Sequence, residues 1–385
     1  MKIISVVGAR PNFMKIAPFI RAIDQHNKDN NPAINHILVH TGQHYDVRMS
    51  KDFFESLGIP EADINLEIGS GSHSEQVGKT MISFEKVLEK EKPDWVVVVG
   101  DVNATLSCSV AARKLHVKVC HIEAGLRSGD ERMPEEINRL VTDRLSNLLL
   151  TPDKLSSENL RKEGVSEEKI RFVGNIMIDT LEANRDKAAQ LSIEEIISKN
   201  IIEGQELTTL HSQFTIYALM TMHRPSNVDK KEVLEPLFNF LVEEVTQDMP
   251  LIFPIHPRTQ SRLKEFGLWE KALKSEKLIL LHPVGYHPML RLNMDARIML
   301  TDSGGLQEEC SVLGTPCLTL RWNTERPITL KEHGGVSTLV GNNIERIREE
   351  YRNTLKSDRA PSRPKKWDGK TAERCLKEIL YYKDR

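Results

Sequence analysis

DWVVVVGD, residues 94–101, decides the fold class that this chain predicts. Trp95 and four consecutive valines separate an aspartate from a glycine, so the run is apolar at every position. A strand with no polar alternation has both faces buried, which is typical of a parallel sheet with helices on both sides. The stretch therefore predicts a central strand of an α/β sheet, with Asp101 at its carboxyl end.

Other short runs rich in Val and Ile alternate with longer stretches of helical periodicity. In the first half they are IISVVG (3–8), HILVHTG (36–42), VKVCHIEAG (117–125) and KIRFVG (169–174). In the second half they are FTIYALMTMH (214–223), LIFPIHP (251–257), KLILLHPV (277–284), ARIMLTDSGG (296–305) and PCLTLR (316–321). This alternation predicts an α/β protein of two doubly wound, Rossmann-like domains. We expect them to face each other across a cleft.

The length of 385 residues also favours two domains over a single core. We expect an N-terminal domain at residues 1–178 and a mostly polar, helical linker at 179–212. A second domain then spans 213–365, and an amphipathic helix within 366–385 packs back on the body.

Composition excludes several classes of protein. The net charge of -2 offers no bulk attraction for nucleic acid, and no segment is apolar over the length that a membrane span needs. The amino-terminal residues lack the pattern of a signal peptide. Five cysteines, odd in number and never spaced as C-x-x-C, favour reduced thiols over disulfides or a structural zinc site. A cytoplasmic enzyme is the expectation.

Ligands of doubly wound domains bind outside the carboxyl ends of the strands, and three carboxylates fall there. Asp101 and Glu123 follow two successive strands, and Glu135 lies in the first turn of a helix that Pro134 opens. Helix capping would account for Asp101, and an exposed ion pair with Arg139 for Glu135. Carboxylates grouped in one cleft push their pKa values apart, however, which provides both an acid and a base.

The helix from Pro134 is expected to bury one apolar stripe. Its members recur at helical spacing and are Ile137, Leu140, Val141, Leu145, Leu148 and Leu149.

A glycine pair and two cations form the candidate anion site. TDSGGLQEECSVLG (301–314) places Gly304 and Gly305 between a strand and a helix, where bare amides attract phosphate, although an ordinary tight turn would look the same. GARPNFMK (8–15) adds Arg10 and Lys15 after the first strand. Neither a Walker motif nor a clean G-x-G-x-x-G is present, so triphosphate hydrolysis and nicotinamide chemistry are disfavoured. Glu309 is placed to meet ribose hydroxyls.

His223 follows the first strand of the second half and is either a structural residue or a partner of a charged ligand. The histidines show no metal-ligand spacing, so we predict no metal.

Ten motifs, in order over nearly the whole chain, resemble those of the non-hydrolysing UDP-N-acetylglucosamine 2-epimerases. They are GARPNFMK, HTGQHYD, GDVNATL, HIEAGLRS, MPEEINR, FVGN, MHRPSN, HPRT, TDSGGLQEE and TERP. The family is similar in fold to the GT-B glycosyltransferases, with the nucleotide sugar between two Rossmann-like domains. The resemblance implies inversion at C2 of the sugar through loss of the C2 proton, departure of UDP and its re-addition to a 2-acetamidoglucal.

The resemblance also implies roles for individual residues and needs no cofactor. The catalytic set would be Asp101, Glu123, Glu135 and His223. The residues holding the UDP-sugar would be Arg10, Lys15, Val284, Met289, Ser303, Gly304, Gly305, Glu309 and Arg326. Gln43, His44 and Glu135 match part of an allosteric substrate site of some members. Members are commonly homodimers, so we expect one here.

This chain departs from bacterial members beside the sugar, at Val102-Asn103, Glu131-Arg132-Met133 and Arg224-Pro225-Ser226. HTGQHYD and RMPEEINR also look like relatives that epimerise UDP-2,3-diacetamido-2,3-dideoxyglucuronate. That sugar and a GT-B glycosyltransferase activity are the alternatives.

Overall fold

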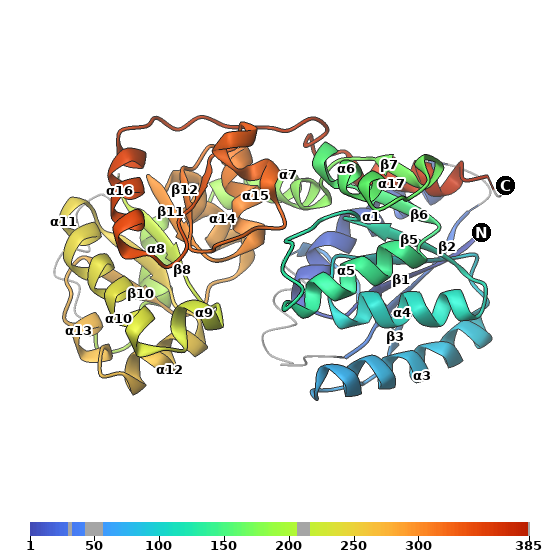
Figure 1. Cartoon of the computed structure of the whole chain (residues 1–385), viewed down its shortest axis with the longest axis horizontal. Coiled ribbons are helices and arrows are strands. Elements are labelled where there is room, and N and C mark those ends of the chain that lie inside the picture. Colours follow the sequence, from blue (N-terminus) through green and yellow to red (C-terminus); the bar gives the residue numbers. More distant parts are fainter. Residues whose placement is uncertain (30–32, 43–56, 206–215, 384–385) are drawn as a thin grey trace. The chain divides into compact units, whose positions relative to one another are not determined.

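The computed structural model describes residues 1–29, 33–42, 57–205 and 216–383 and divides the chain into two compact units (Figure 1). Unit 1 comprises Met1–Ala183 together with Pro364–Arg385, and unit 2 comprises Asn184–Arg363. No helix among the described residues is long and apolar enough to cross a membrane. The five cysteines are buried and form no disulfide.

Unit 1 is built on a sheet of seven parallel strands in the order β3-β2-β1-β4-β5-β6-β7. The strands are β1 (Lys2–Val7), β2 (Asn35–His40), β3 (Ile64–Asn65), β4 (Trp95–Val99), β5 (Lys118–Ile122), β6 (Leu148–Thr151) and β7 (Ile170–Phe172). Every residue of β4 is buried, as the apolar run predicts. The strand order reverses between β1 and β4, which is the switch point where doubly wound folds bind ligands.

The α-helices of unit 1 alternate with the strands along the chain. They are α1 (Arg10–Asp29), α3 (His73–Glu91), α4 (Asn103–Lys114), α5 (Pro134–Leu145), α6 (Lys154–Lys162), α7 (Ile176–Ala189) and α17 (Thr371–Leu380). A capping box of Ser72 and Glu75 begins α3, and the Asp153 side chain caps α6. The chain returns to unit 1 at its end, where α17 contacts α1 (Figure 1).

The prediction of one buried apolar stripe from Ile137 to Leu149 is wrong. Helix α5 ends at Leu145, and Leu148 and Leu149 belong to β6. The buried face of α5 is polar and charged instead, while Ile137 is 50% exposed. Burying ionic groups is unfavourable unless they have partners, so this inversion indicates that the helix is oriented by specific polar contacts.

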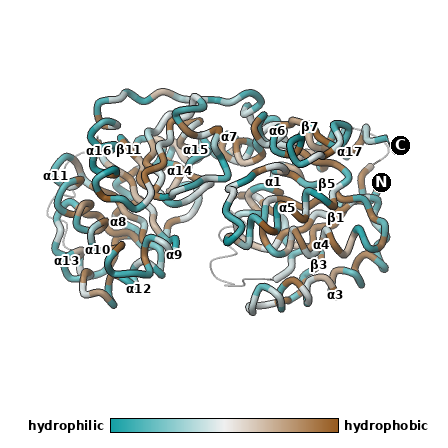
Figure 2. Tube along the Cα trace, viewed as in Figure 1, coloured by the Kyte–Doolittle hydropathy of each residue, from teal (hydrophilic) through white to brown (hydrophobic). Residues whose placement is uncertain are grey.

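Unit 2 repeats the same arrangement with six parallel strands in the order β10-β9-β8-β11-β12-β13. The strands are β8 (Ala218–Thr221), β9 (Leu251–Pro254), β10 (Leu278–Leu281), β11 (Ile298–Thr301), β12 (Cys317–Thr319) and β13 (Ser337–Leu339). The helices are α8 (Ile193–Asn200), α9 (Pro225–Val228), α10 (Lys231–Phe240), α11 (Thr246–Asp248), α12 (Pro257–Glu265), α13 (Trp269–Leu273), α14 (Tyr286–Asp295), α15 (Gly304–Leu313) and α16 (Ile344–Leu355). Apolar residues are concentrated in the strands of both units, whereas outer helices such as α12 are largely hydrophilic (Figure 2).

The predicted fold class of two doubly wound α/β domains is confirmed, but three strands escaped prediction. The sequence of β6 is a leucine run that begins three residues after the end of α5, so it looks like a continuation of that helix. β3 and β13 have only two and three residues. Periodicity alone cannot separate such short apolar runs from helix.

The structure divides the chain within α7, between Ala183 and Asn184, which lies inside the linker expected at 179–212. In α8, Ile193, Ile196 and Ile197 share a core cluster with residues of β8, β9 and β10. Their spacing places three large apolar side chains on one helix face, and burying that face attaches the helix to unit 2.

Candidate active site

The turn from β1 to α1 is held against the end of β4 by Asn12. Its side-chain oxygen accepts from the amides of Gly8 (3.3 Å) and Ala9 (3.1 Å), and its amide donates to the Val99 carbonyl (2.8 Å). The two strands that flank the switch point are thus joined at their carboxyl ends. The side chain of Arg10, predicted to bind phosphate, lies outside the described part.

Lys15 and Glu123 form a buried ion pair at these strand ends. The Lys15 ammonium donates to Glu123 Oε2, and their side chains are only 8% and 2% exposed. Gly100 makes room for the pair, since a Cβ on it would lie 3.1 Å from Lys15 Nζ and 3.6 Å from Glu123 Oε2. Glu123 itself has a φ of 71°, in the left-handed region that costs a non-glycine residue about 1 kcal/mol or more. Such strain is concentrated at functional sites.

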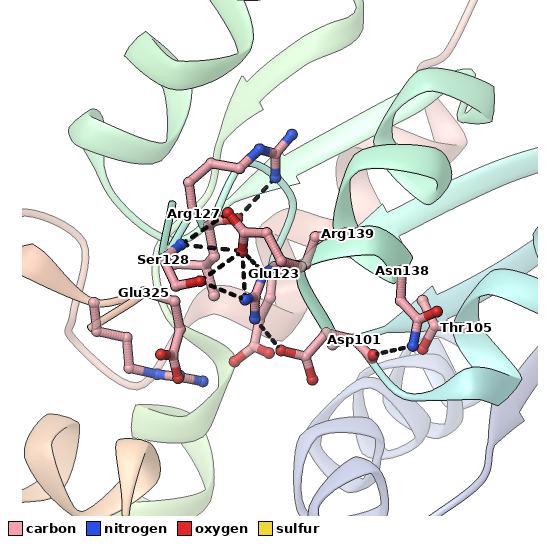
Figure 3. A network of polar contacts seen from close by, with 12 residues as sticks. Asp101, Thr105, Glu123, Arg127, Ser128, Asn138, Arg139 and Glu325 are labelled. Atoms are coloured by element: carbon pink, nitrogen blue, oxygen red, sulfur yellow. Dashed lines mark hydrogen bonds and ion pairs between the residues drawn. The ribbon is translucent and has the colours of Figure 1, made fainter. Parts of the chain in front are cut away.

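Asp101 is held by α5 (Figure 3). Its carboxylate pairs with Arg139, which is 2% exposed, and its carbonyl accepts from Asn138 Nδ2 at 2.8 Å. The carboxylate of Asp101 is thus anchored as an ion pair, which helix capping alone would not provide.

Arg139 also pairs with Glu136. The exposed ion pair of Arg139 with Glu135, considered from the sequence, is not formed, although the structure describes both residues. The Glu136 carboxylate accepts from Arg139 Nε (2.9 Å) and from the amides of Ser128 (3.0 Å) and Gly129 (2.9 Å). Burial opposes the charge of Glu136, but these donors lower the pKa of its carboxyl overall. Glu135 is half-buried in the same first turn of α5.

In unit 2 the imidazole of His223 is oriented by a buried carboxylate. His223 Nδ1 lies 2.9 Å from Asp302 Oδ1, and Asp302 Oδ2 accepts from the amides of His223 (2.9 Å) and Arg224 (2.8 Å). Asp302 is fully buried; burial works against its charge, yet the His223 ring and these amides lower the pKa of the carboxyl. The His223 side chain is 38% exposed, so its other ring nitrogen can meet a ligand.

The glycine pair predicted to bind phosphate begins α15. Ser303 occupies the N-cap position without a side-chain cap, so the first amides of a ten-residue helix remain for another acceptor. Nothing lies within 4 Å of a Cβ built on Gly305, whereas one on Gly304 would meet Glu325 Oε1 at 2.7 Å and Arg326 Nη1 at 2.8 Å.

Arg326 thus lies against the Gly304 turn, buried in an ionic cluster. It pairs with Glu308 (Nε to Oε1, 2.7 Å) and with Glu325, which also binds Arg321 at 2.8 Å. Burial opposes the charge of Glu325, but the two guanidinium groups hold the pKa of its carboxyl far below its ordinary value. These contacts give Arg326 a role in shaping the turn, beside the contact with UDP that the resemblance implies.

Glu309, predicted to meet ribose hydroxyls, is 3% exposed on α15. Burial raises the pKa of its carboxyl to about 7, and the nearby charge of Glu308 also raises it. Hydrogen bonds from Tyr286 and Asn293 lower this pKa but do not offset the effect of burial. A carboxyl that loses its proton near neutrality suits a site where ligand hydroxyls can stabilise the ionised form.

This raised pKa predicts a pH-dependent stability. Between about pH 4.5 and 7 the folded state keeps a proton that the unfolded chain has lost, so the free energy of unfolding falls as pH rises, by roughly 3 kcal/mol in total. Glu309→Gln removes this penalty. It should unfold at a higher temperature than the parent at pH 8 and at a similar temperature at pH 5, by calorimetry. Glu85→Gln, an exposed change on α3, is the control; parallel pH profiles for parent and Glu309→Gln would contradict the prediction.

Val284 precedes α14 and Met289 lies in it, and both are half-buried against one core cluster of unit 2. Gln43 and His44, matched to an allosteric site, lie outside the described residues. Over the ranges that the structure describes, no group of three or more His, Cys, Asp or Glu side chains could hold a metal ion.

Three residues of this geometry were missed by the sequence reasoning: Asn12, Glu136 and Asp302. Each lies inside a motif that was already quoted, within two residues of a residue singled out as functional. Only Asp302 lies just after a strand end, whereas Asn12 and Glu136 lie in the first turns of α1 and α5, so their position in a quoted motif was the available signal.

Unit 1 has two carboxylates near its switch point, and unit 2 has an uncapped glycine turn at its own. Together, the two doubly wound units define an enzyme of the GT-B-like class that acts on a phosphorylated ligand. The chain belongs to the UDP-N-acetylglucosamine 2-epimerases, whose family model matches residues 26–380. It is therefore an isomerase of the epimerase type.

Individual relatives agree with this assignment. The UDP-N-acetylglucosamine 2-epimerase of Methanocaldococcus jannaschii is 42% identical over the full length of both chains. The crystal structure of that organism's enzyme in complex with UDP-GlcNAc and UDP covers 99% of this chain and 100% of its own, at 41% identity and a TM-score of 0.85. The UDP-2,3-diacetamido-2,3-dideoxy-D-glucuronate 2-epimerase of Pseudomonas aeruginosa is 38% identical over 92% of each chain.

Proposed function

We propose that this chain interconverts UDP-N-acetylglucosamine and UDP-N-acetylmannosamine by inverting C2 of the sugar. Unit 1 supplies the acid/base groups Asp101, Glu123 and Glu135. Unit 2 supplies most of the residues that hold UDP, at the start of α15 and around His223, and unit 1 adds Arg10 and Lys15. Family membership and the relatives' printed activities support the substrate, and the residue roles rest on the geometry described above.

The reaction needs no external oxidant or reductant. A carboxylate takes the C2 proton, the C1–O bond breaks with its electron pair leaving on the UDP β-phosphate, and a C1=C2 double bond forms. A proton is then delivered to C2 from the opposite face, and the phosphate oxygen re-adds at C1. Because the proton leaves one face and arrives at the other, the site needs more than one acid/base group.

The observation that carries this proposal is the pair of carboxylates on neighbouring strand ends, Asp101 after β4 and Glu123 after β5, each held by a buried cation. An anchored carboxylate keeps a defined position for proton transfer. In unit 2, the His223–Asp302 pair and the amides of α15 can stabilise charge that develops on a leaving diphosphate.

The proposal is tested in heavy water. UDP-N-acetylglucosamine incubated with the chain in D₂O should gain deuterium at C2, with UDP-N-acetylmannosamine appearing, both followed by proton NMR. Release of free N-acetylmannosamine and UDP would instead indicate a hydrolysing enzyme. Transfer of the sugar only after addition of an acceptor would indicate a glycosyltransferase, and either result would overturn the proposal.

The 38% identical diacetamidoglucuronate epimerase makes that nucleotide sugar the second candidate substrate. The same NMR assay separates the two candidates when each nucleotide is supplied alone. Faster C2 exchange with the glucuronate would reassign the substrate while leaving the proposed chemistry unchanged.

We further propose that the enzyme is a cytoplasmic homodimer whose contact includes the exposed apolar side of α5. Ile137 and Val141 lie one helical turn apart and are 50% and 36% exposed, on a helix whose polar side faces the core. Large apolar side chains exposed in this way favour contact with a second copy of the chain.

The double change Ile137→Glu with Val141→Glu should convert the dimer to a monomer in sedimentation equilibrium, because it places four charges in a two-fold contact. Tyr381→Glu, at a residue 72% exposed after α17, is the control and should leave the mass unchanged. A double variant that keeps the mass of the parent dimer would exclude this surface.

A further inference from the structure

Behind the two proposed catalytic carboxylates lies a buried ionic cluster of His121, Arg127 and Asp143, which we call the His121 cluster. His121 and Asp143 are 0% and 2% exposed, on β5 and α5 respectively. His121 Nδ1 lies 2.6 Å from Asp143 Oδ1, and Arg127 Nη1 lies 2.8 Å from Asp143 Oδ2. None of the three has a part in the proton transfers proposed above.

The cluster contacts the backbone of both turns that carry those carboxylates. His121 Nε2 donates to the carbonyl of Gly100, the residue before Asp101, at 2.9 Å. Asp143 Oδ2 accepts from the amide of Gly125, two residues after Glu123, at 3.0 Å. One carboxylate thus connects the end of β4, through the imidazole, with the turn that follows β5.

These contacts coincide with the strained backbone of the site. Glu123 (φ 71°) and Gly125 (φ 83°) are both left-handed, and the Ala124 amide between them donates to Leu150 on β6 at 3.1 Å. A left-handed non-glycine residue persists only where surrounding contacts determine it. The Gly125–Asp143 bond supplies one such contact, next to the ion pair of Glu123 with Lys15.

Both ring nitrogens of His121 face oxygen atoms, Asp143 Oδ1 on one side and the Gly100 carbonyl on the other. Burial opposes the charge of Asp143, yet the charges of His121 and Arg127 lower the pKa of its carboxyl overall. Arg127 is held in turn by Glu163 through two bonds of 2.7 Å. Replacing buried ion pairs by apolar residues often leaves the stability of a protein unchanged or raises it, so a charged cluster here favours a specific geometric role.

We propose that Asp143 is a positioning residue: through His121 and the Gly125 amide it sets the positions of the turns that carry Asp101 and Glu123. This inference rests on the proposed function, which makes those two carboxylates the acid/base groups. Asp143 contacts no substrate and acts only through the backbone of these turns.

Asp143→Asn keeps the shape of the side chain but removes its charge and one acceptor. It should lower kcat by at least 100-fold and the rate of C2 deuterium exchange equally, with KM and the Kd for UDP within about threefold of the parent. Asp143→Glu, which keeps the charge, should recover part of the loss.

Asp179→Asn is the matched control. Asp179 is also a buried carboxylate of unit 1 that accepts two backbone amides, from Thr371 (3.0 Å) and Ala372 (2.7 Å), at the start of α17. Both variants lose a carboxylate bonded to backbone amides, but Asp179→Asn should keep kcat within about twofold. Equal losses of kcat in the two folded variants, or an Asp143→Asn enzyme within threefold of the parent, would overturn the inference.

Two further measurements keep the test decisive. If Asp143→Asn does not fold, His121→Gln replaces it, since its amide can reach the Gly100 carbonyl but cannot also bind Asp143; an unchanged kcat would refute the positioning role. If the parent shows no C2 exchange, the proposed function fails, and a crystal structure of Asp143→Asn still tests the cluster. That structure should show Glu123 outside the left-handed region, and an unchanged Glu123 backbone would refute the inference.

Discussion

Glu123→Gln should lower kcat by roughly 10³-fold while the Kd for UDP stays within about threefold. The change removes a proposed acid/base group from the end of β5 and leaves the Lys15 ammonium buried without its counter-charge. Apart from Arg10 and Lys15, the UDP-binding residues that we propose belong to unit 2, so nucleotide affinity should be largely preserved. Asp101→Asn should act in the same way, because it removes a proposed acid/base group and one of the two carboxylates that pair with Arg139. Steady-state kinetics and calorimetric titration with UDP measure the two effects separately.

The control for Glu123→Gln is Glu91→Gln, which breaks another lysine–glutamate pair of unit 1, between β1 and the end of α3. Lys2 begins β1 and its ammonium lies 3.2 Å from Glu91, at the amino end of the strand and away from the proposed site. Surface pairs of this kind contribute little, so activity should not change. If Glu123→Gln, Asp101→Asn and the corresponding amide at Glu135 all retained full turnover, the catalytic assignment would have to be abandoned.

Gly304→Ala should destabilise unit 2 and weaken UDP binding at least tenfold. The new methyl group would lie 2.7 Å from Glu325 Oε1 and 2.8 Å from Arg326 Nη1, and both side chains are buried in one ionic cluster. Because that cluster cannot shift without losing ion pairs, we expect a cost of about 1–3 kcal/mol together with a displaced turn. Thermal unfolding and titration with UDP give the two quantities.

Gly305→Ala separates the two effects of this change. Nothing lies within 4 Å of its added methyl group, and alanine favours the helix over glycine, so stability should stay the same or rise. UDP binding should still weaken, because glycine at a helix start allows close approach of an anion. Equal stability of Gly304→Ala and Gly305→Ala would contradict this prediction, because it would show that Glu325 and Arg326 can move away from the added methyl group at little energetic cost.

The candidate site was predicted from the sequence to the level of strand ends. Asp101, Glu123, His223 and Ser303 each follow a strand, and the parallel order of both sheets brings such residues to one edge of each sheet. Their partners were not predicted. Lys15 is 108 residues from Glu123 in the sequence, and Asp302 is 79 residues from His223. Periodicity describes one element at a time, so it carries no information about such long-range pairs.

Helix α5 shows where sequence patterns fail. The apolar spacing of Ile137, Leu140 and Val141 predicts burial, yet the helix turns Glu136, Arg139 and Asp143 inward. Each buried charge has partners on distant segments, including Asp101, Ser128 and His121. Paired charges can outweigh the burial of three aliphatic side chains only when those partners already stand in place. A local pattern therefore cannot anticipate the orientation.

The sequence by itself determined the two doubly wound units, the carboxylates that follow their strands and the glycine turn before α15. These depend on hydrophobic alternation and on residues close together in the chain. Only the tertiary structure decided which cation holds each carboxylate, how α5 is turned and why Glu123 keeps a left-handed backbone. Those features depend on the partners that buried charges find across the sheet, because a charge removed from water is stable only where the fold supplies an opposite charge or a hydrogen-bond donor.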